Sequence, residues 1–491
     1  MDIEALNPLA AGRAPHFESV HSRRDFLCRA GAGFGALALW SLLSRDALAA
    51  DEVAASILKN PLTAKPPQFA VKAKSVIWCF LDGGPSHLDL FDPKPELTKL
   101  NGQPLPASFP RPMTAMGKTA YTPLLASQRT FKQYGQSGIW VSDWLPEIAE
   151  CVDDMAVIRS CWADGLTHVG SVCEMNTGSI LMGRPCVGAW VLYGLGSVCE
   201  NLPGYVVLAD YSQEPPGGSR QWSTGFMPST YQGTKFRDGK TPILHVEPPE
   251  GYSETRQRRE LDFLQTLNRQ HLASRADDTD LEARIASYEL AYKMQAAAPE
   301  ATDLSSESAE TLALYGVDQE ATASNGRNCL MARRLVERGV RFVQLYMGSG
   351  SKWDAHSDVE GNHSQYCKET DRPIAGLIKD LKQRGMLDST LVIWGGEFGR
   401  TPMSESGTGR DHNPYGFTMW MAGGGIKPGT VYGATDDIGL YAVENKAHIH
   451  DIHATILALL GLDHESLTFL HNGRDERLTI TSGKVIKDII A

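Results

Sequence analysis

Three acidic residues each lie just after a short apolar run, and two histidines accompany them. The runs have the length and composition of buried strands. The acids and the runs that precede them are Asp82 after residues 75–81, Asp354 after residues 341–347 and Glu397 after residues 391–394. His356 lies shortly beyond Asp354, and His412 follows Glu397 after a stretch rich in Ser, Thr and Gly. Carboxylate and imidazole ligands together suit Zn, Mn or Ca better than a soft metal, so the pattern predicts a divalent metal site.

The acids can form one site only if the strands before them lie side by side. In an open α/β sheet, sites form at the carboxyl ends of parallel strands. If the three runs are neighbouring parallel strands, Asp82, Asp354 and Glu397 converge, and His356 and His412 join them from the loops. We therefore predict that these five residues hold one or two divalent ions. Such ions would clamp a phosphoryl or sulfuryl group and activate water.

A second group of polar residues lies at a predicted strand–loop–helix junction. A strand is expected at residues 155–160 and a helix at residues 172–177, which places Thr167, His168 and Ser171 near the start of the helix. Helix N-termini favour anions and activated hydroxyls, so these three residues are candidates for catalysis. The alternative is an ordinary helix cap beside a buried histidine.

Strand-like and helix-like segments alternate along most of the remaining chain, which is typical of an α/β fold. Residues 254–298 are dense in charge and carry apolar residues at helical spacing, so we expect two long helices with a break near residues 277–280. Residues 93–140 and 398–409 are expected to be loops. Asp451 is expected to cap a helix at residues 452–460. Other expected strands and helices lie at residues 204–208, 417–421, 144–151, 186–195, 328–338 and 366–384.

The first fifty residues have the features of a twin-arginine signal. Arg23 and Arg24 precede an uncharged apolar segment, and residues 47–49 supply the small side chains that a signal peptidase reads. We expect residues 1–50 to be a Tat signal peptide, so that the Tat machinery exports the folded protein to the periplasm or beyond. A membrane anchor is the alternative, but the apolar segment is shorter than the ~20 residues of a spanning helix. No stable membrane span is expected after cleavage.

Composition limits the other possibilities. Of 491 residues, 42% are hydrophobic, and the net charge of −11 argues against a nucleic-acid partner. Residues 51–74 are expected to be a linker, and residues 75–491 a single domain. Eight cysteines remain beyond the signal, and an even number permits disulfides in an exported chain. They form no CxxC pair, which argues against a zinc–thiolate site.

Five motifs carry a resemblance to a known family. They are FLDGGPSHLDLFDPKP, WDAHSD, GEFGRTP, GRDHNPYGFTMWMAGGG and DIHATILALLGLDH. Together they resemble the domain of unknown function 1501 family, which is common in exported proteins of planctomycete-like bacteria and often labelled sulfatase-like. That family in turn is similar to the alkaline phosphatase superfamily. The resemblance implies an alkaline-phosphatase-like three-layer sandwich, with a mostly parallel central sheet, helices on both faces and a helical hairpin inserted near residues 254–298.

The motif order of the superfamily also implies roles for individual residues. Asp82 matches its first acid, the segment 167–171 lies near its nucleophile, and His412 matches its last histidine. Asp354 with His356 matches its next acid and histidine, although the superfamily's usual spacing could select Asp358 instead. Glu397-Phe398 stands where an Asp-His pair is usual, so one of two ions is expected to be lost or weakly bound. The sulfatase nucleophile signature is absent.

Two functions follow from this resemblance. The first is an exported metal-dependent hydrolase of phosphate or sulfate esters, acting on a small-molecule or carbohydrate ester. Arg400 or Arg410 would stabilise the developing charge, and Thr167 or Ser171 would be the nucleophile unless water activated by the metal replaces it. The alternative is a non-catalytic binding or scaffold protein that keeps one metal and an anion pocket. A hydroxyl aimed at the metal favours the enzyme, whereas His168 in that position favours the binding protein.

Overall fold

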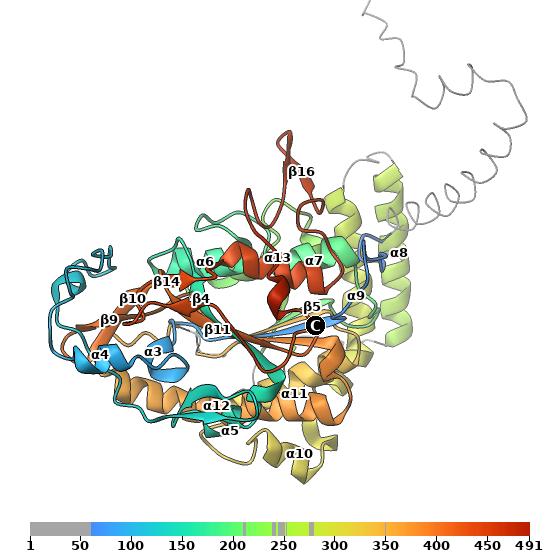
Figure 1. Ribbon diagram of the computed structural model, residues 1–491. Helices are drawn as coiled ribbons and strands as arrows, with labels where there is room; N and C mark the ends of the chain where they lie inside the picture. Colours follow the sequence, from blue (N-terminus) through green and yellow to red (C-terminus); the bar gives the residue numbers. More distant parts are fainter. Residues whose placement is uncertain are drawn as a thin grey trace, which may run out of the picture. The chain divides into compact units, whose positions relative to one another are not determined.

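A sheet lies at the centre of the protein (Figure 1). It has nine strands, and all of them except one run in the same direction. Its order is β12-β4-β11-β8-β1-β7-β5-β6, and β15 also pairs with β4. Only β11 is antiparallel to its neighbours. The strands are β1 (Ser75–Phe80), β4 (Met155–Trp162), β5 (Tyr205–Ala209), β6 (Thr234–Arg237), β7 (Phe342–Tyr346), β8 (Thr390–Gly395), β11 (Phe417–Ala422), β12 (Thr430–Tyr432) and β15 (Ala447–His448).

The computed structural model describes residues 60–209, 213–237, 242–243, 251, 253–273, 279–348 and 350–491. They belong to one unit, Asn60–Ala491. The expected signal peptide and the first part of the expected linker lie outside the described residues. Among the helices of the described ranges, none has the length and apolar character needed to cross a bilayer.

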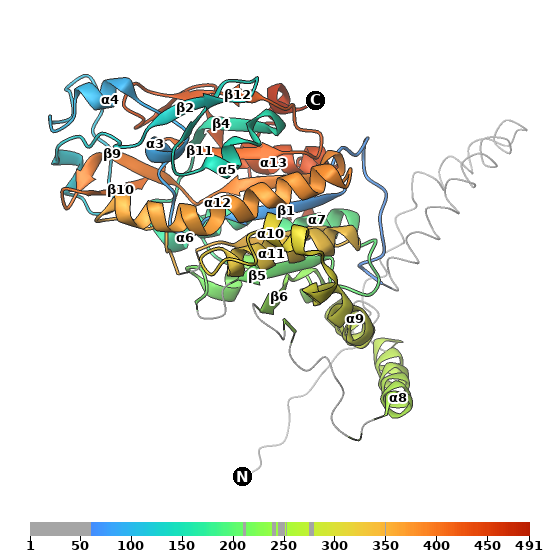
Figure 2. The same cartoon turned by 90° about the horizontal axis from the view of Figure 1, so that it is seen from below.

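Helices cover both faces of the sheet, as Figures 1 and 2 show from two directions. Alternation along β1 explains this arrangement, because successive side chains of a strand point to opposite faces. Ile77 and Cys79 pack into one hydrophobic cluster, and Val76 and Trp78 into the other. One layer contains α5 (Pro146–Ala149), α10 (Ala309–Leu314), α11 (Ala323–Glu337) and α12 (Val359–Gln383), and the other contains α6 (His168–Thr177), α7 (Val187–Leu195) and α13 (Ile449–Leu459). The predicted three-layer α/β fold is confirmed.

The three strands that precede the predicted acids are neighbours. β1 pairs in parallel with β8 on one side and with β7 on the other, so that Phe80 is aligned with both Gly395 and Tyr346. The carboxyl ends of the three strands therefore lie at one edge of the sheet. The predicted adjacency of these strands is confirmed, and it brings the loops that contain Asp82, Asp354 and Glu397 together.

The smaller elements correct several expectations. The expected helical pair is present as α8 (Glu254–Ala273) and α9 (Thr279–Thr302), linked by an ion pair of 3.1 Å between Arg258 and Glu289. The expected loop at 398–409 is wrong, because the chain there forms a hairpin of β9 (Gly399–Glu405) and β10 (Gly409–Asn413). Asp451 is not the cap of α13. His448 is, and the Asp451 carboxylate accepts a hydrogen bond from the His448 backbone N–H.

The expected loops at residues 93–140 are interrupted by three short elements, α4 (Pro95–Lys99), β2 (Phe131–Tyr134) and β3 (Ile139–Ser142). Further short elements are α3 (His87–Leu90), β13 (Ala434–Thr435), β14 (Ala442–Glu444), β16 (Phe469–His471) and β17 (Arg474–Glu476). The eight cysteines beyond residue 59 are all free thiols. Cys79 and Cys329 are fully buried and pack in the core, as their apolar surroundings in the sequence suggest.

Candidate metal centre

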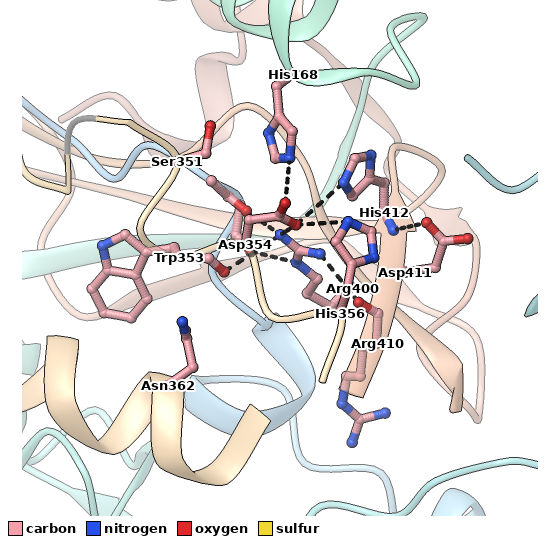
Figure 3. Close-up of polar contacts among 12 residues, drawn as sticks. His168, Ser351, Trp353, Asp354, His356, Asn362, Arg400, Arg410, Asp411 and His412 are labelled. Carbon is pink, nitrogen blue, oxygen red and sulfur yellow. Dashed lines mark hydrogen bonds and ion pairs between the residues drawn. The ribbon is translucent and has the colours of Figure 1, made fainter. Parts of the chain in front are cut away.

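Three histidines point their Nε2 atoms at the carboxylate of Asp354 (Figure 3). Oδ1 of Asp354 lies 3.0 Å from Nε2 of His356 and 3.3 Å from Nε2 of His412. Oδ2 lies 3.1 Å from Nε2 of His168. One ligand atom from each of the four residues lies within 4.8 Å of all the others. We call these four residues the histidine–aspartate centre.

Each histidine of the centre is oriented through its other ring nitrogen. Nδ1 of His412 lies 2.8 Å from the backbone carbonyl oxygen of Leu166, and Nδ1 of His168 lies 2.7 Å from Oε1 of Glu397. Nδ1 of His356 contacts a carboxylate oxygen of Glu405. A carbonyl or carboxylate oxygen can only accept, so each Nδ1 carries a hydrogen and donates it. In the neutral rings, every Nε2 therefore presents a lone pair to the centre.

This arrangement fits a divalent cation. Histidine ligands of metals usually donate their second nitrogen to a carboxylate or a carbonyl group, which fixes the ring and makes the ligand more basic. Three lone pairs aimed at a carboxylate repel it unless protons or a cation lie between them. Nε2 of His168 is buried and makes no hydrogen bond of acceptable geometry, although Oδ2 of Asp354 is only 3.1 Å away. The donor set of three imidazoles and one carboxylate is therefore suited to hold a metal ion such as Zn.

Without a cation, the histidines and Asp354 stabilise one another's charge. Burial opposes the charged form of His168, but its contacts with Asp354 and Glu397 outweigh burial and raise its pKa to about 9. The hydrogen bond to Asp354 raises the pKa of His356, whereas burial lowers that of His412. Burial alone would raise the pKa of Asp354, yet its close contacts with the three histidines and the charge of Arg400 hold it far below its usual range. The ionisable groups of the centre are therefore strongly coupled to one another, although the centre is partly exposed. Such coupling is typical of functional sites.

Arg400 lies beside the centre and contacts Asp354. Its guanidinium is fully buried and donates to Oδ1 of Asp354 at 2.7 Å. It also donates to the backbone carbonyl groups of Gly84 and Arg410, at 2.9 and 3.1 Å, and to that of Gly83. With its donors engaged in this way, Arg400 ties the turn after β1 to β10 and fixes the position of Asp354.

Asp82 and Glu397 lie beside the centre and outside the group of four. Oδ2 of Asp82 accepts from the backbone N–H of Ser351 at 3.0 Å, and its Oδ1 is buried without a partner. Burial and then the neighbouring Glu397 raise the pKa of Asp82 well above its usual value. Both oxygens of Glu397 face the N–H of Gly83, at 3.1 and 3.2 Å. Glu397 therefore contacts the centre only through His168.

The side chains of Thr167, Ser171 and Arg410 make no hydrogen bond or ion pair with the four residues of the centre. Thr167 is exposed at the start of α6, and its side chain makes no capping hydrogen bond. Ser171 is buried with its hydroxyl unpaired, next to Gly165, where an added Cβ would lie 2.5 Å from that hydroxyl. Arg410 is bound to Asp89 at 2.9 Å, and Figure 3 shows its guanidinium directed away from Asp354. The pairing of β10 with β9 is irregular between Arg410 and His412, where a step of two residues on β10 faces a step of four on β9.

Two other groups of acids and histidines have ligand atoms as close together as a metal site requires. In both groups, the hydrogen bonds of the histidine argue against a bound metal. In the first, Asp164, Glu174 and His448, the Nδ1 atom of His448 accepts from the backbone N–H of His450. Its Nε2 must then carry the hydrogen, and it faces both carboxylates at 3.5 Å. This histidine is a donor to acids and the cap of α13.

The second group consists of His356, Glu405 and Asp411. Its imidazole nitrogen Nδ1 already donates to Glu405. The two oxygens of Asp411 accept from the backbone N–H groups of His412 and Met116, at 2.7 and 3.0 Å. These hydrogen bonds stabilise the hairpin and the position of His356.

Sequence reasoning missed the parts of the centre that depend on local geometry. It placed His168 among catalytic residues, and the structure brings that histidine to Asp354 beside His356 and His412. It did not single out Glu405 as the partner of His356. The alternation of a strand could have found it, because Glu405 ends β9, but the proline and polar residues of that segment indicated a loop.

Fold and centre together define an α/β protein with a candidate metal site at the carboxyl ends of three adjacent parallel strands. The chain belongs to the family described as "Protein of unknown function (DUF1501)", whose model matches residues 73–490. The family predicted from the motifs is therefore confirmed. No curated protein matches this sequence.

Solved structures similar to this chain include a sulfatase and a protein in the alkaline phosphatase superfamily. One is the PsFucS1 sulfatase from Pseudoalteromonas sp., with 14% identity and a TM-score of 0.33 over 84% of this chain and 72% of that chain. Another is a protein in the alkaline phosphatase superfamily from Vibrio parahaemolyticus, with 12% identity and a TM-score of 0.34 over 82% and 70% of the two chains. At this degree of similarity, no residue role or reaction transfers from these proteins.

Proposed function

We propose that this protein is a metal-dependent hydrolase of phosphate or sulfate esters. The observation that supports the proposal is the convergence of three Nε2 atoms on Asp354, each histidine being oriented by a donated Nδ1 hydrogen. Between 17 and 26% of the side-chain surface of His168, Asp354 and His356 is exposed, so a substrate has access to them. An ion held by these residues and His412 would polarise an ester oxygen and make water a stronger nucleophile.

The chain's own residues position the reactants in this proposal. Asp354 and the three histidines form the first layer, and Arg400 holds Asp354 in place through the 2.7 Å hydrogen bond. Glu397 and Glu405 orient the rings of His168 and His356 so that Nε2 faces Asp354. Because neither the Thr167 nor the Ser171 hydroxyl is hydrogen-bonded to the centre, water is the proposed nucleophile and no covalent enzyme intermediate is expected.

A second candidate function has one observation in its favour. His168 lies where a hydroxyl nucleophile was expected from the motif order, and this placement was the sign of a non-catalytic descendant. Such a protein would bind a metal and an anion at the same centre and serve as a binding or scaffold protein. The two candidates share the metal site and differ only in turnover.

The metal site is tested on purified, chelator-treated protein to which Zn, Mn or Ca is added. We expect the ion to raise the unfolding temperature, since a ligand at about 100 times its Kd stabilises by about 2.7 kcal/mol. His356→Ala should abolish this shift, and His471→Ala, at the end of β16, should retain it. No bound ion in the wild type, or an equal response of both variants, would refute the site.

Turnover decides between hydrolase and binding protein. The metal-loaded protein is assayed with a panel of phosphate and sulfate esters, small and carbohydrate, with His356→Ala as the inactive control. Hydrolysis by the wild type alone supports the enzyme. Metal-dependent binding of an ester without turnover supports the second candidate.

We also propose that the protein acts in the periplasm or outside the cell, after export by the Tat machinery. The support is the order of Arg23-Arg24, the apolar segment and the small residues at 47–49. Replacing Arg23 and Arg24 with lysine should leave the protein in the cytoplasm, as measured by fractionation. Undiminished export of that variant would contradict this route.

A further inference from the structure

We propose that Glu174, in the second turn of α6, is a positioning residue for two histidines of the histidine–aspartate centre. It holds the loop of residues 163–167, which connects β4 to α6, and this loop orients His412 and leads directly into His168. The inference rests on the proposed function, because it concerns residues that are proposed to bind the metal. Three sets of contacts carry it: those between Glu174 and the loop, those between the loop and β10, and those between Glu174 and the start of α13.

The buried carboxylate of Glu174 accepts hydrogen bonds from the backbone of the loop that precedes its own helix. Its Oε2 accepts from the N–H of Gly165 at 2.8 Å. Its Oε1 and Oε2 lie 3.0 and 3.1 Å from the backbone nitrogen of Asp164, whose N–H they share. Hydrogen bonds to an ionised carboxylate are shorter and stronger than those between neutral groups. Glu174 therefore fixes the loop to α6.

Gly165 brings the loop into close contact with the first turn of α6. A Cβ added to Gly165 would lie 2.5 Å from the hydroxyl oxygen of Ser171 and 2.9 Å from its backbone nitrogen. Only a residue without a side chain allows two stretches of backbone to approach this closely. The path of the loop is therefore set against α6, and with it the position of His168, where the helix begins.

The same loop contacts the end of β10 at two points. The backbone N–H of Ala163 donates to the carbonyl oxygen of Pro414 at 2.9 Å, and the carbonyl oxygen of Leu166 accepts from Nδ1 of His412 at 2.8 Å. The second of these hydrogen bonds determines which ring nitrogen carries the hydrogen and which one faces the centre. A shift of the loop would therefore remove the acceptor that orients His412 and would also move the start of α6.

Glu174 also faces the start of α13. Its Oε1 lies 3.5 Å from Nε2 of His448, and this nitrogen carries a hydrogen because Nδ1 accepts from the backbone N–H of His450. His448 caps α13 and belongs to β15, which pairs with β4, the strand that leads into the loop. The carboxylate is therefore placed between α6 and the edge of the sheet, and both elements limit its movement.

The role of Glu174 is tested first by metal affinity. Glu174→Leu removes both acceptors, whereas Glu174→Gln keeps one oxygen that can accept from the loop. The matched control is Asp371→Leu, because Asp371 is a buried carboxylate that also accepts from two backbone N–H groups, at 2.8 and 2.9 Å, but joins α12 to α5. Calorimetry with Zn on chelator-treated protein should show a loss of about tenfold or more in Glu174→Leu, a smaller loss in Glu174→Gln and wild-type affinity in Asp371→Leu.

A second measurement follows His412 in the absence of metal. Its ring is buried, so the hydrogen that Nδ1 donates to Leu166 should exchange slowly with water and give a downfield proton resonance. His412→Gln identifies this resonance by its loss. Chelator-treated wild type and Asp371→Leu should both show it, whereas in Glu174→Leu it should be shifted or absent. Gly165→Ala, which crowds the loop and leaves the carboxylate in place, should have the same effect and replaces Glu174→Leu if that variant does not fold.

The outcomes separate this inference from the proposed function. Wild-type Zn affinity in folded Glu174→Leu, or an unchanged His412 resonance in that variant or in Gly165→Ala, would overturn the positioning role and leave the proposed function intact. An equal loss of Zn affinity in Asp371→Leu would overturn it as well, since the loss would then follow from destabilisation alone. If the wild type binds no ion, the proposed function is refuted, and the His412 resonance still decides whether Glu174 orients that ring.

Discussion

Nδ1 of His168 lies 2.7 Å from Oε1 of Glu397, and this contact joins the start of α6 to the end of β8. The same carboxylate accepts from the N–H of Gly83, which follows β1. Glu397 therefore holds a histidine from one layer of the protein against two adjacent strands of the sheet. Its charge favours a hydrogen on Nδ1, which leaves the lone pair of Nε2 free for a ligand role.

Glu397→Gln should weaken metal binding without removing any of the four ligands. The amide oxygen can still accept from Nδ1 of His168, but it lacks the charge that makes the ring basic. Loss of such an orienting carboxylate typically costs about 10–100-fold in metal affinity. Calorimetry with Zn measures the change, and Glu444→Gln on the exposed end of β14 is the matched control. Wild-type affinity in Glu397→Gln would show that this contact does not orient the ligand.

Gly83→Ala should disturb the centre through a backbone clash. Gly83 has a φ of +115°, and a Cβ there would lie 2.6 Å from the backbone nitrogen of Asp354. Gly102 also has a positive φ, +77°, but a Cβ at that position meets nothing within 4 Å. Gly102→Ala should therefore show only the cost of its backbone conformation, roughly 1–2 kcal/mol. Gly83→Ala should cost more and should also weaken metal binding, as measured by denaturant unfolding and calorimetry.

A comparable result for the two alanine variants would contradict this account. If Gly83→Ala binds the ion as tightly as the wild type, the turn after β1 does not set the position of Asp354. Gly102→Ala should retain full metal affinity in either case.

Arg410→Met should destabilise the fold and leave the metal site intact. The guanidinium of Arg410 and the carboxylate of Asp89 are both fully buried, 2.9 Å apart. Removing one partner of a buried ion pair leaves an uncompensated charge and typically costs about 3–5 kcal/mol. Arg474→Met, on the exposed β17, should change stability little. Folded Arg410→Met that has lost its ion would instead place Arg410 in the centre, as the sequence suggested.

The sequence predicted those features of the site that follow from strand order. Apolar runs ending in Asp82 and Glu397 are recognisable as buried strands, and parallel neighbours necessarily bring their carboxyl ends together. The runs before Asp354 and Glu397 flank the run before Asp82 in the sheet. Long periodic elements such as α8 and α9 were also predictable, because a charged helix with an apolar stripe has a clear period.

Features that depend on side-chain geometry were not predictable. Arg410 binds Asp89 whereas His412 faces Asp354, and the irregular pairing of β10 with β9 between them has no signature in the sequence. The αL conformation of Asp358, with a φ of 49°, starts α12 several residues earlier than its apolar pattern indicates. Whether His168 lies against Asp354 or in the core depends on the exact path of the loop before α6. Tertiary contacts determine each of these local conformations, so the sequence pattern alone does not reveal them.

The buried His363 should make the protein less stable in acid. Its Nε2 accepts from the backbone N–H of Ser86 at 2.9 Å, so the ring is neutral in the folded protein, and burial lowers its pKa to about 3. The unfolded chain has a histidine pKa of about 6.5. Because the folded pKa is the lower one, the stabilisation is complete above about pH 6.5 and is lost as the pH falls toward 3.

The loss amounts to about 1.4 kcal/mol for each pH unit below 6.5. His363→Gln keeps an acceptor for Ser86 and does not titrate. Its stability relative to the wild type should therefore improve by about 1.4 kcal/mol per unit between pH 6 and 4, whatever its deficit near pH 7.5. Urea unfolding of both chelator-treated proteins at each pH measures this difference, in which the titration of all other groups cancels. A difference that stays constant with pH would show that His363 takes up its proton without unfolding.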